Sequence, residues 1–191
     1  MSKFSEDIAR YKLKGSHGKQ LWLNPAVWAI AVYRFGNWLY VDKPSALIAA
    51  PLKVVFLFAN LFCEVVMEMH IDCQATIGPG LYIAHIGGVH MNPAAVLGKN
   101  CDVAHRVTIG ASAMGRQGVP VLGDDVYVGT GATLVGKIKI GSGAKIAANT
   151  LVITNVPEGA TIMGVPGRII MRPPKPTQPQ ALAAVEKSDA Q

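Results

Sequence analysis

The stretch VLGDDVYVGTGATLVGKIKIGSGAKIAANTLV, residues 121–152, carries an aliphatic side chain at every sixth position. An α-helix has 3.6 residues per turn and would scatter a six-residue period around its axis. Short strands joined by sharp corners satisfy the period, because the aliphatic side chains then stack inward and glycines form the corners. The pattern extends over Ile71, Ile77, Met91, Leu97, Val103, Ile109, Leu122, Val128, Leu134, Ile140, Ile146 and Val152. It predicts a mainly β fold, a hexapeptide-repeat parallel β-helix with three hexads in each triangular coil.

The sequence divides into three zones. Residues 1–68 are expected to form an N-terminal helical segment, with Ser5 as the first N-cap and a second helix starting at Asn24 and Pro25. Residues 69–170 are expected to form the β-helix domain. Residues 171–191 are a Pro-rich polar tail that we expect to be flexible.

The segment SALIAAPLKVVFLFANLFC, residues 45–63, is almost long enough to span a membrane. Lys53 near its centre, Pro51 inside it and Glu64 just after it argue against a span, because a central charge and a helix break are costly in lipid. Two interpretations stay open: a helix buried by other helices or subunits, or peripheral contact with a membrane.

Composition excludes several classes of protein. The chain has 191 residues and a net charge of +6, but its basic residues are scattered and no stacking aromatics accompany them, so nucleic acid is not an expected partner. The positive field suits an anionic ligand such as a phosphorylated cofactor. Three cysteines without a CxxC motif, and an opening segment without a signal peptide, predict a cytoplasmic protein, peripheral at the inner face of the membrane if residues 45–63 contact lipid.

The repeat is interrupted twice. Ile77 and Met91 are 14 residues apart where two hexads would give 12, and the excess falls around His85 and His90. The other interruption is the glycine-rich segment ASAMGRQGVP, residues 111–120, which we interpret as a loop extruded from the coil. A histidine beside such a loop suits general base catalysis, although spacing alone equally allows His85 to cap a corner through a backbone hydrogen bond.

The runs IGPGLYIAHIGGVHMNPAAVLGKNCDVAHRVTIG (77–110) and 121–157, followed by GVPGRI, resemble the serine acetyltransferases and their relatives in polysaccharide biosynthesis. The resemblance covers residues 70 to about 170, interruptions included. It implies a left-handed β-helix, a homotrimer with active sites between neighbouring subunits, and acetyl transfer from acetyl-CoA to a hydroxyl group. His85, in AHIGG, corresponds to the catalytic histidine of that family and would deprotonate the acceptor hydroxyl.

The resemblance also implies the other site residues. The group that orients the histidine comes from the preceding coil, where His70 stands by ungapped comparison and Asp72 would stand in another register; a backbone carbonyl is the remaining alternative. Apart from the resemblance, Arg116 and Gln117 in the loop could hydrogen-bond a sugar acceptor, or they could form an ordinary solvated loop tip. His90 is expected either at the rim of the acceptor site or in a structural role. Acetyl-CoA is expected along Gly110, Ala111, Ser112, Thr130, Gly131, Lys145 and Ala148, with Lys145 near the phosphates unless it is an ordinary surface lysine.

Three positions depart from the serine-specific enzymes. Gly118 and Val119 replace the arginine and histidine that help to bind serine, and Ala84 replaces an acidic residue before the catalytic histidine. A free serine needs partners for its charged groups, so the sequence favours a saccharide or polysaccharide precursor as acceptor, with L-serine as the alternative.

Two other classes compete with an acetyltransferase. A zinc enzyme like the gamma carbonic anhydrases would use His85, His90 and a third ligand from His105 or His70, but the flanking residues favour no metal. A non-catalytic scaffold subunit is the second alternative.

Overall fold

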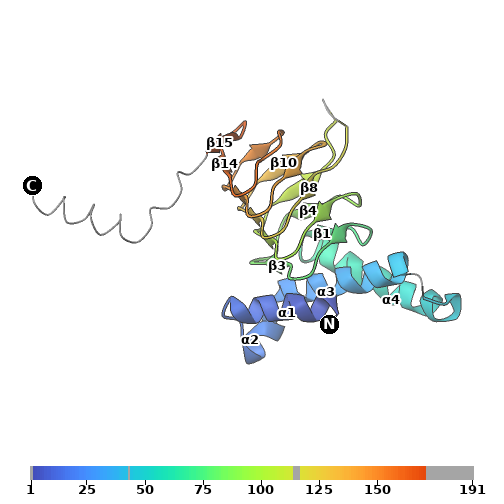
Figure 1. Cartoon of the computed structure of the whole chain (residues 1–191). Coiled ribbons are helices and arrows are strands. Elements are labelled where there is room, and N and C mark those ends of the chain that lie inside the picture. Colours follow the sequence, from blue (N-terminus) through green and yellow to red (C-terminus); the bar gives the residue numbers. More distant parts are fainter. Residues whose placement is uncertain (1, 43, 114–116, 171–191) are drawn as a thin grey trace, which may run out of the picture.

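A triangular column of short strands stands on a layer of helices (Figure 1). The computed structural model describes residues 2–42, 44–113 and 117–170. The expected tail, residues 171–191, lies outside the described residues.

The strands form three parallel sheets that make the three faces of the column. The first sheet, sheet A, contains β1 (Met69–Ile71), β4 (Val89–Met91), β7 (Thr108–Gly110), β10 (Thr133–Val135) and β13 (Leu151–Val152). Sheet B contains β2 (Thr76–Ile77), β5 (Val96–Leu97), β8 (Val121–Leu122) and β11 (Lys139–Ile140). Sheet C contains β3 (Tyr82–Ile83), β6 (Asp102–Val103), β9 (Tyr127–Val128), β12 (Lys145–Ile146), β14 (Thr161–Met163) and, antiparallel to β14, β15 (Arg168–Ile170).

The repeat positions form the core of the column. Equivalent aliphatic residues stack from coil to coil, as in the pairs Ile77 with Leu97 and Leu122 with Ile140. All twelve aliphatic residues of the six-residue period are at most 6% exposed. The predicted left-handed parallel β-helix with an N-terminal helical segment is confirmed.

The pairing of the strands shows how many residues each of the two interruptions adds to its coil. His70 pairs with His90, twenty residues on, and His90 with Thr108, eighteen residues on, which is the regular coil of three hexads. Thr108 pairs with Thr133, twenty-five residues on. The first coil therefore carries two extra residues, between β3 and β4, and the third carries seven, between β7 and β8.

The helical layer comprises α1 (Lys3–Leu13), α2 (Gly18–Leu23), α3 (Pro25–Asn37), a π-helical turn η1 (Trp38–Asp42) and α4 (Ala46–Val65). Asn24 caps α3 as expected, since its side chain accepts a hydrogen bond from Ala26 N. The expectation for Ser5 was wrong: Ser2 is the N-cap of α1, and its side chain accepts a hydrogen bond from Ser5 N. The helix starts one turn earlier because Ser2 has the extended backbone that an N-cap requires.

Side chains of helices α1 and α3 form hydrogen bonds with the backbone groups at the open edge of the first coil. The Arg34 guanidinium donates to the carbonyls of Ile77 (2.7 Å) and Gly78 (2.6 Å), while Asp7 Oδ1 accepts from Leu81 N at 2.8 Å. Asp7 and Arg34 also form an ion pair with each other. An uncovered strand edge invites pairing with another chain, so the helices act as the terminal cap of the solenoid.

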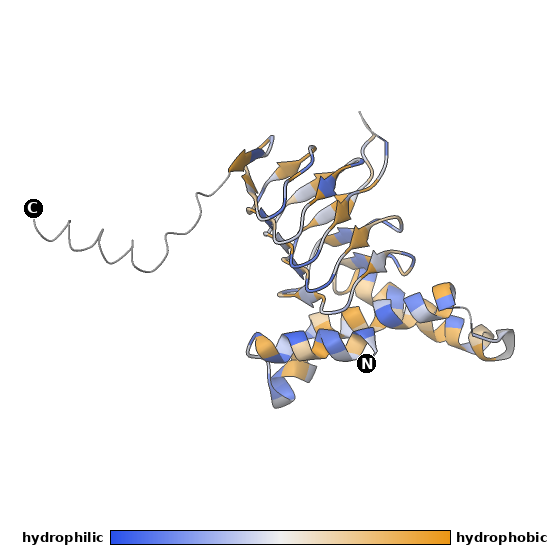
Figure 2. Cartoon of the chain, viewed as in Figure 1, coloured by the Kyte–Doolittle hydropathy of each residue, from blue (hydrophilic) through white to orange (hydrophobic). Residues whose placement is uncertain are grey.

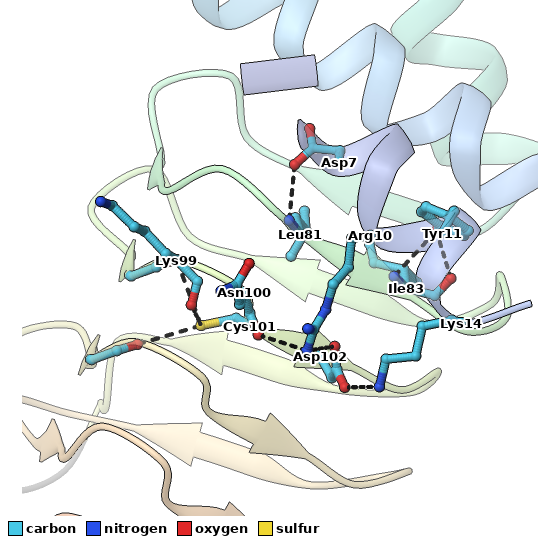
Figure 3. A network of polar contacts seen from close by, with 12 residues as sticks. Asp7, Arg10, Tyr11, Lys14, Leu81, Ile83, Lys99, Asn100, Cys101 and Asp102 are labelled. Carbon is cyan, nitrogen blue, oxygen red and sulfur yellow. Dashed lines mark hydrogen bonds and ion pairs between the residues drawn. The ribbon is translucent and has the colours of Figure 1, made fainter. Parts of the chain in front are cut away.

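Tyr11 on α1 contributes to the same cap. Its hydroxyl donates to Ile83 O at 2.7 Å and accepts from Ile83 N at 3.2 Å, and burial raises the pKa of this phenol well above its ordinary value. Figure 3 shows these contacts beside the more exposed ion pairs that Arg10 and Lys14 make with Asp102. Strand β3 is thereby fixed immediately before His85.

Helix α4 is apolar on most of its surface. Residues Ile48–Val65 are long and apolar enough to span a membrane by length and composition, and 17% of them are buried. Only one stripe, which includes Ala49, Phe56 and Cys63, packs inward. The rest of the helix exposes large apolar side chains, namely Ile48, Val54, Val55, Leu57, Phe58, Leu61, Phe62 and Val65. Figure 2 colours the ribbon by hydropathy, with hydrophobic residues in orange. The rest of the chain thus covers only part of α4. That other subunits or lipid contact its exposed face stays a prediction.

Candidate active site

The two extra residues of the first coil project His85 from the corner between sheets C and A. In the regular coils, backbone hydrogen bonds join successive coils at this corner: Gly131 N donates to His105 O, and Asn149 N donates to Thr130 O. Arg106 N makes the equivalent bond to Gly87 O. Gly87, His105 and Thr130 therefore occupy equivalent positions. Residues 84–86 stand where the next coil has Ala104 alone, which accounts for the two extra residues. His85 is exposed on this insertion.

The ring of His85 packs against His105 in the next coil. The ring centroids are 5.9 Å apart with an interplanar angle of 71°, which is an edge-to-face arrangement. The Nδ1 atom of His105 is buried and has no hydrogen-bond partner among the described residues. Two histidines that are distant in sequence thus share one corner of the column.

His70 and His90 form a second pair on the outer face of sheet A. Their rings stack at 4.4 Å with an interplanar angle of 11°. Glu64 Oε1 lies 3.0 Å from His70 Nδ1 and also accepts from Asn60 Nδ2 at 2.7 Å. Burial and the neighbouring His70 lower the pKa of His90, and Glu64 partly offsets this. His70, which was expected to orient His85, is engaged with Glu64 and His90.

Asp72, the second group expected to orient His85, has a local partner. Its Oδ1 atom accepts a hydrogen bond from Gln74 N at 2.8 Å, two residues along the chain. Such contacts are typical of aspartates that stabilise their own turn. The structure thus records local partners for both Asp72 and His70, and a role for either in orienting His85 stays a prediction.

The residues expected to bind acetyl-CoA fall in three places on the protomer. Thr130, Gly131 and Ala148 lie at the corner that also holds His85 and His105. Gly110, Ala111 and Ser112 lie at the opposite corner of sheet A, where its strand β7 ends. Lys145 is exposed on sheet C. The small exposed side chains of Ala111 and Ala148 leave main chain accessible, which fits an extended pantetheine arm.

The extruded loop differs from the serine-specific pattern for a steric reason. Gly118 has φ +139°, and a Cβ atom built on it would lie 2.8 Å from Lys137 Cβ, so this path of the loop has no room for an arginine there. Val119 is half-buried and packs against the core. Gln117 is exposed, and Arg116 lies outside the described residues.

Two hollows among the described residues lie away from these positions. One of about 580 Å³ lies on sheet B over Leu122 and Ile140, and one of about 480 Å³ lies between Phe4 and Trp38 in the helical layer. Neither is lined by His85 or by any residue expected to bind acetyl-CoA or the acceptor. His85 itself is exposed, so the histidine corner is accessible to solvent on one protomer.

The cysteines and the possible metal ligands lie as follows on the single chain. Burial raises the pKa of the Cys101 thiol to about 11, and the Cys63 side chain is buried against the helical layer. A zinc site needs three or more protein ligands, yet in the part of the chain that the structure describes no three His, Cys, Asp or Glu residues gather closely enough to hold a metal.

Comparison with known proteins places the chain among hexapeptide-repeat transferases. Residues 120–154 match the bacterial transferase hexapeptide family model, which describes six repeats. The chain is 34% identical over 147 residues to the serine acetyltransferase of Mycobacterium tuberculosis, covering 76% of this chain and 61% of that protein. It is 30% identical to the crystal structure of Neisseria gonorrhoeae serine acetyltransferase in complex with serine, with a TM-score of 0.72 over 88% of this chain and 68% of that chain. A serine acetyltransferase structure in complex with CoA has 26% identity and a TM-score of 0.72, covering 88% of this chain and 68% of that one.

The chain belongs to the serine acetyltransferase-like family of hexapeptide-repeat proteins. It spans between half and about three fifths of the length of the curated relatives that it matches. Within this family, the pairing of His85 with His105 was not anticipated from the sequence. Coil arithmetic could have placed both at one corner, because His85 lies two positions before Gly87, which is the residue equivalent to His105 in the preceding coil.

Proposed function

We propose that this member of the serine acetyltransferase-like family is an acetyl-CoA-dependent O-acetyltransferase in which His85 is the general base and L-serine the acceptor. The observation that carries the proposal is the position of His85, exposed on a two-residue insertion at a corner of the column. The likeness to serine acetyltransferases over most of the chain supports it.

The mechanism requires an imidazole that can reach the acceptor hydroxyl. His85 is solvent-exposed, and histidine is the side chain that most often serves as a general base, so it can accept the hydroxyl proton as the oxygen attacks. Acetyl-CoA supplies the activated acetyl group as a thioester; the acceptor oxygen bonds to the carbonyl carbon, the C–S bond breaks, and CoA leaves as a thiolate. His85 then holds the proton that the leaving thiolate requires.

Two features support acetyl-CoA as the co-substrate. Thr130, Gly131 and Ala148 continue the corner of His85 and His105 toward the later coils, so an extended arm bound there would end beside the base. Lys145 is exposed on the adjoining sheet C, where its charge would favour a phosphate. One relative has been crystallised with CoA.

The active site is proposed to form between subunits of a homotrimer. On one protomer His85 is exposed, and helix α4 exposes a long apolar face. A neighbouring copy that covered both would exclude water from the base and bury the exposed side chains of α4. The assembly is proposed to be cytoplasmic.

The proposal has two versions, which differ in the acceptor of the acetyl group. The curated relatives and the serine-bound structure favour L-serine over the saccharide that the sequence analysis expected. A saccharide is the second candidate because Gly118 has no room for the serine-binding arginine.

An acceptor screen tests both versions. Purified protein is incubated with acetyl-CoA and L-serine, amino sugars, nucleotide sugars or acidic oligosaccharides, and thiol release is recorded. Thiol release with L-serine supports the main proposal, and turnover of sugars alone replaces serine with a saccharide. No release with any acceptor, combined with no acetyl-CoA binding by calorimetry, would refute acetyl transfer and favour a scaffold.

A further inference from the structure

The ring of His85 meets a side chain that belongs to the rigid part of the column. His105 lies in the regular coil above the insertion, and the two centroids are 5.9 Å apart with an interplanar angle of 71°. Aromatic rings at such distances prefer this edge-to-face arrangement, in which the positive edge of one ring meets the negative face of the other. The contact therefore favours one orientation of the His85 ring.

The backbone around His105 is held on both sides. Ala104 N donates to Val128 O at 2.9 Å, Gly131 N donates to His105 O at 3.1 Å, and Arg106 N donates to Gly87 O at 2.8 Å. His85, in contrast, lies on the two-residue insertion and is exposed. A ring on an anchored backbone thus borders a ring on a projecting insertion.

The groups that the sequence analysis expected to orient His85 have other partners. His70 contacts Glu64 and stacks on His90, and the Asp72 carboxylate binds Gln74 N. His105 is the side chain whose contact with the His85 ring the structure records.

We propose that His105 is a positioning residue for the proposed reaction, and that its ring fixes the orientation of the His85 imidazole across the boundary between two coils. The inference rests on the proposed role of His85 as the base. His105 itself acts through His85, so its loss should slow turnover while leaving acetyl-CoA binding almost unchanged.

The Nδ1 atom of His105 is buried and has no hydrogen-bond partner in the described part of the chain, so the ring contact can be tested without removing a hydrogen bond. An unpaired buried nitrogen destabilises the folded protein, so His105→Phe keeps an aromatic ring and removes this penalty. We expect the melting temperature of this variant to equal or exceed that of the wild type. His105→Ala removes the ring, and His17→Ala, at an exposed position before α2, is the matched histidine control.

The kinetic test measures kcat and the KM for acetyl-CoA with the best acceptor from the screen. A displacement of a reacting group by about 1 Å costs on the order of 100-fold in rate, so His105→Ala should lower kcat by roughly 10- to 100-fold with KM within about twofold. His105→Phe should stay within about threefold of wild-type kcat, because its ring preserves the contact. Unchanged kcat in His105→Ala, or equal losses in His105→Ala and His105→Phe, would overturn the proposal.

A spectroscopic measurement separates this inference from the proposed function. In the protein without ligands, the ring C–H resonance of His85, assigned by its loss in His85→Ala, should shift in His105→Ala and stay unchanged in His17→Ala. If the His85 resonance does not shift in His105→Ala, the two rings are not in contact and the inference is wrong. If the wild type turns over no acceptor, the proposed function fails, whereas a shifted resonance still establishes the ring contact.

Discussion

Arg34 and Asp7 form a buried ion pair with two hydrogen bonds, from Arg34 Nε to Asp7 Oδ2 at 2.8 Å and from Arg34 Nη2 to Asp7 Oδ1 at 3.0 Å. Their side chains are 7% and 0% exposed. The same two side chains bind the edge of the first coil, so this pair joins the helical layer to the β-helix that carries His85.

Removing one member of this pair should destabilise the whole chain. Arg34→Met leaves the Asp7 carboxylate buried without its partner, and such losses cost about 3–5 kcal/mol in free energy of unfolding. Urea unfolding followed by circular dichroism measures the effect. Lys14→Met is the control, because the Lys14–Asp102 pair is more exposed and should contribute at most about 1 kcal/mol. Equal losses in the two variants would contradict the role assigned to Arg34.

The His70–His90 pair should make stability depend on pH. Burial and His70 lower the pKa of His90 in the folded protein, although Glu64 opposes this. Below the ordinary histidine pKa of about 6.5, the unfolded chain therefore binds a proton at His90 more readily than the folded chain, and stability falls as pH falls.

The substitution His90→Thr tests this dependence, since threonine is the residue at the equivalent position of the next coil, Thr108. We expect its melting temperature to fall less than that of the wild type between about pH 7.5 and 5. His17→Ala should keep the wild-type loss. Parallel curves for the wild type and His90→Thr would show that His90 does not titrate in this way.

The apolar face of α4 should be covered in solution. Phe58 is 67% exposed in the single chain, and Leu57 and Phe62 lie beside it on the helix. We expect sedimentation velocity to show a trimer for the wild type, and a smaller species for Phe58→Glu, because a carboxylate in an apolar interface is costly. Lys53→Gln, on the exposed part of the same helix, should remain trimeric. A monomeric wild type that binds anionic lipid vesicles would instead support membrane contact.

The β-helix was predictable because its signal is local and repeated. Leu122, Val128 and Leu134 each fill the same structural position, so one period defines the core. The insertion at His85 was predictable for the same reason, as a departure from that period. Both conclusions need only the spacing of aliphatic residues along the chain.

Contacts between elements were not predictable in this way. Asp7 and Arg34 read as ordinary surface charges in sequence, and only the docking of α1 and α3 on the first coil buries them together. The partners of the histidines depend on which coil lies above which, and the exclusion of arginine at position 118 depends on the positive φ of Gly118. Such features are set by tertiary structure, which spacing describes only partly.

The most direct test of the central claim compares wild type and His85→Ala in thiol release from acetyl-CoA, with L-serine as acceptor and the acetylated product identified by mass spectrometry. General base catalysis typically contributes about 10²- to 10⁴-fold in rate, so kcat of His85→Ala should fall by that factor while calorimetry shows unchanged acetyl-CoA binding. A wild-type rate in correctly folded His85→Ala would contradict the account.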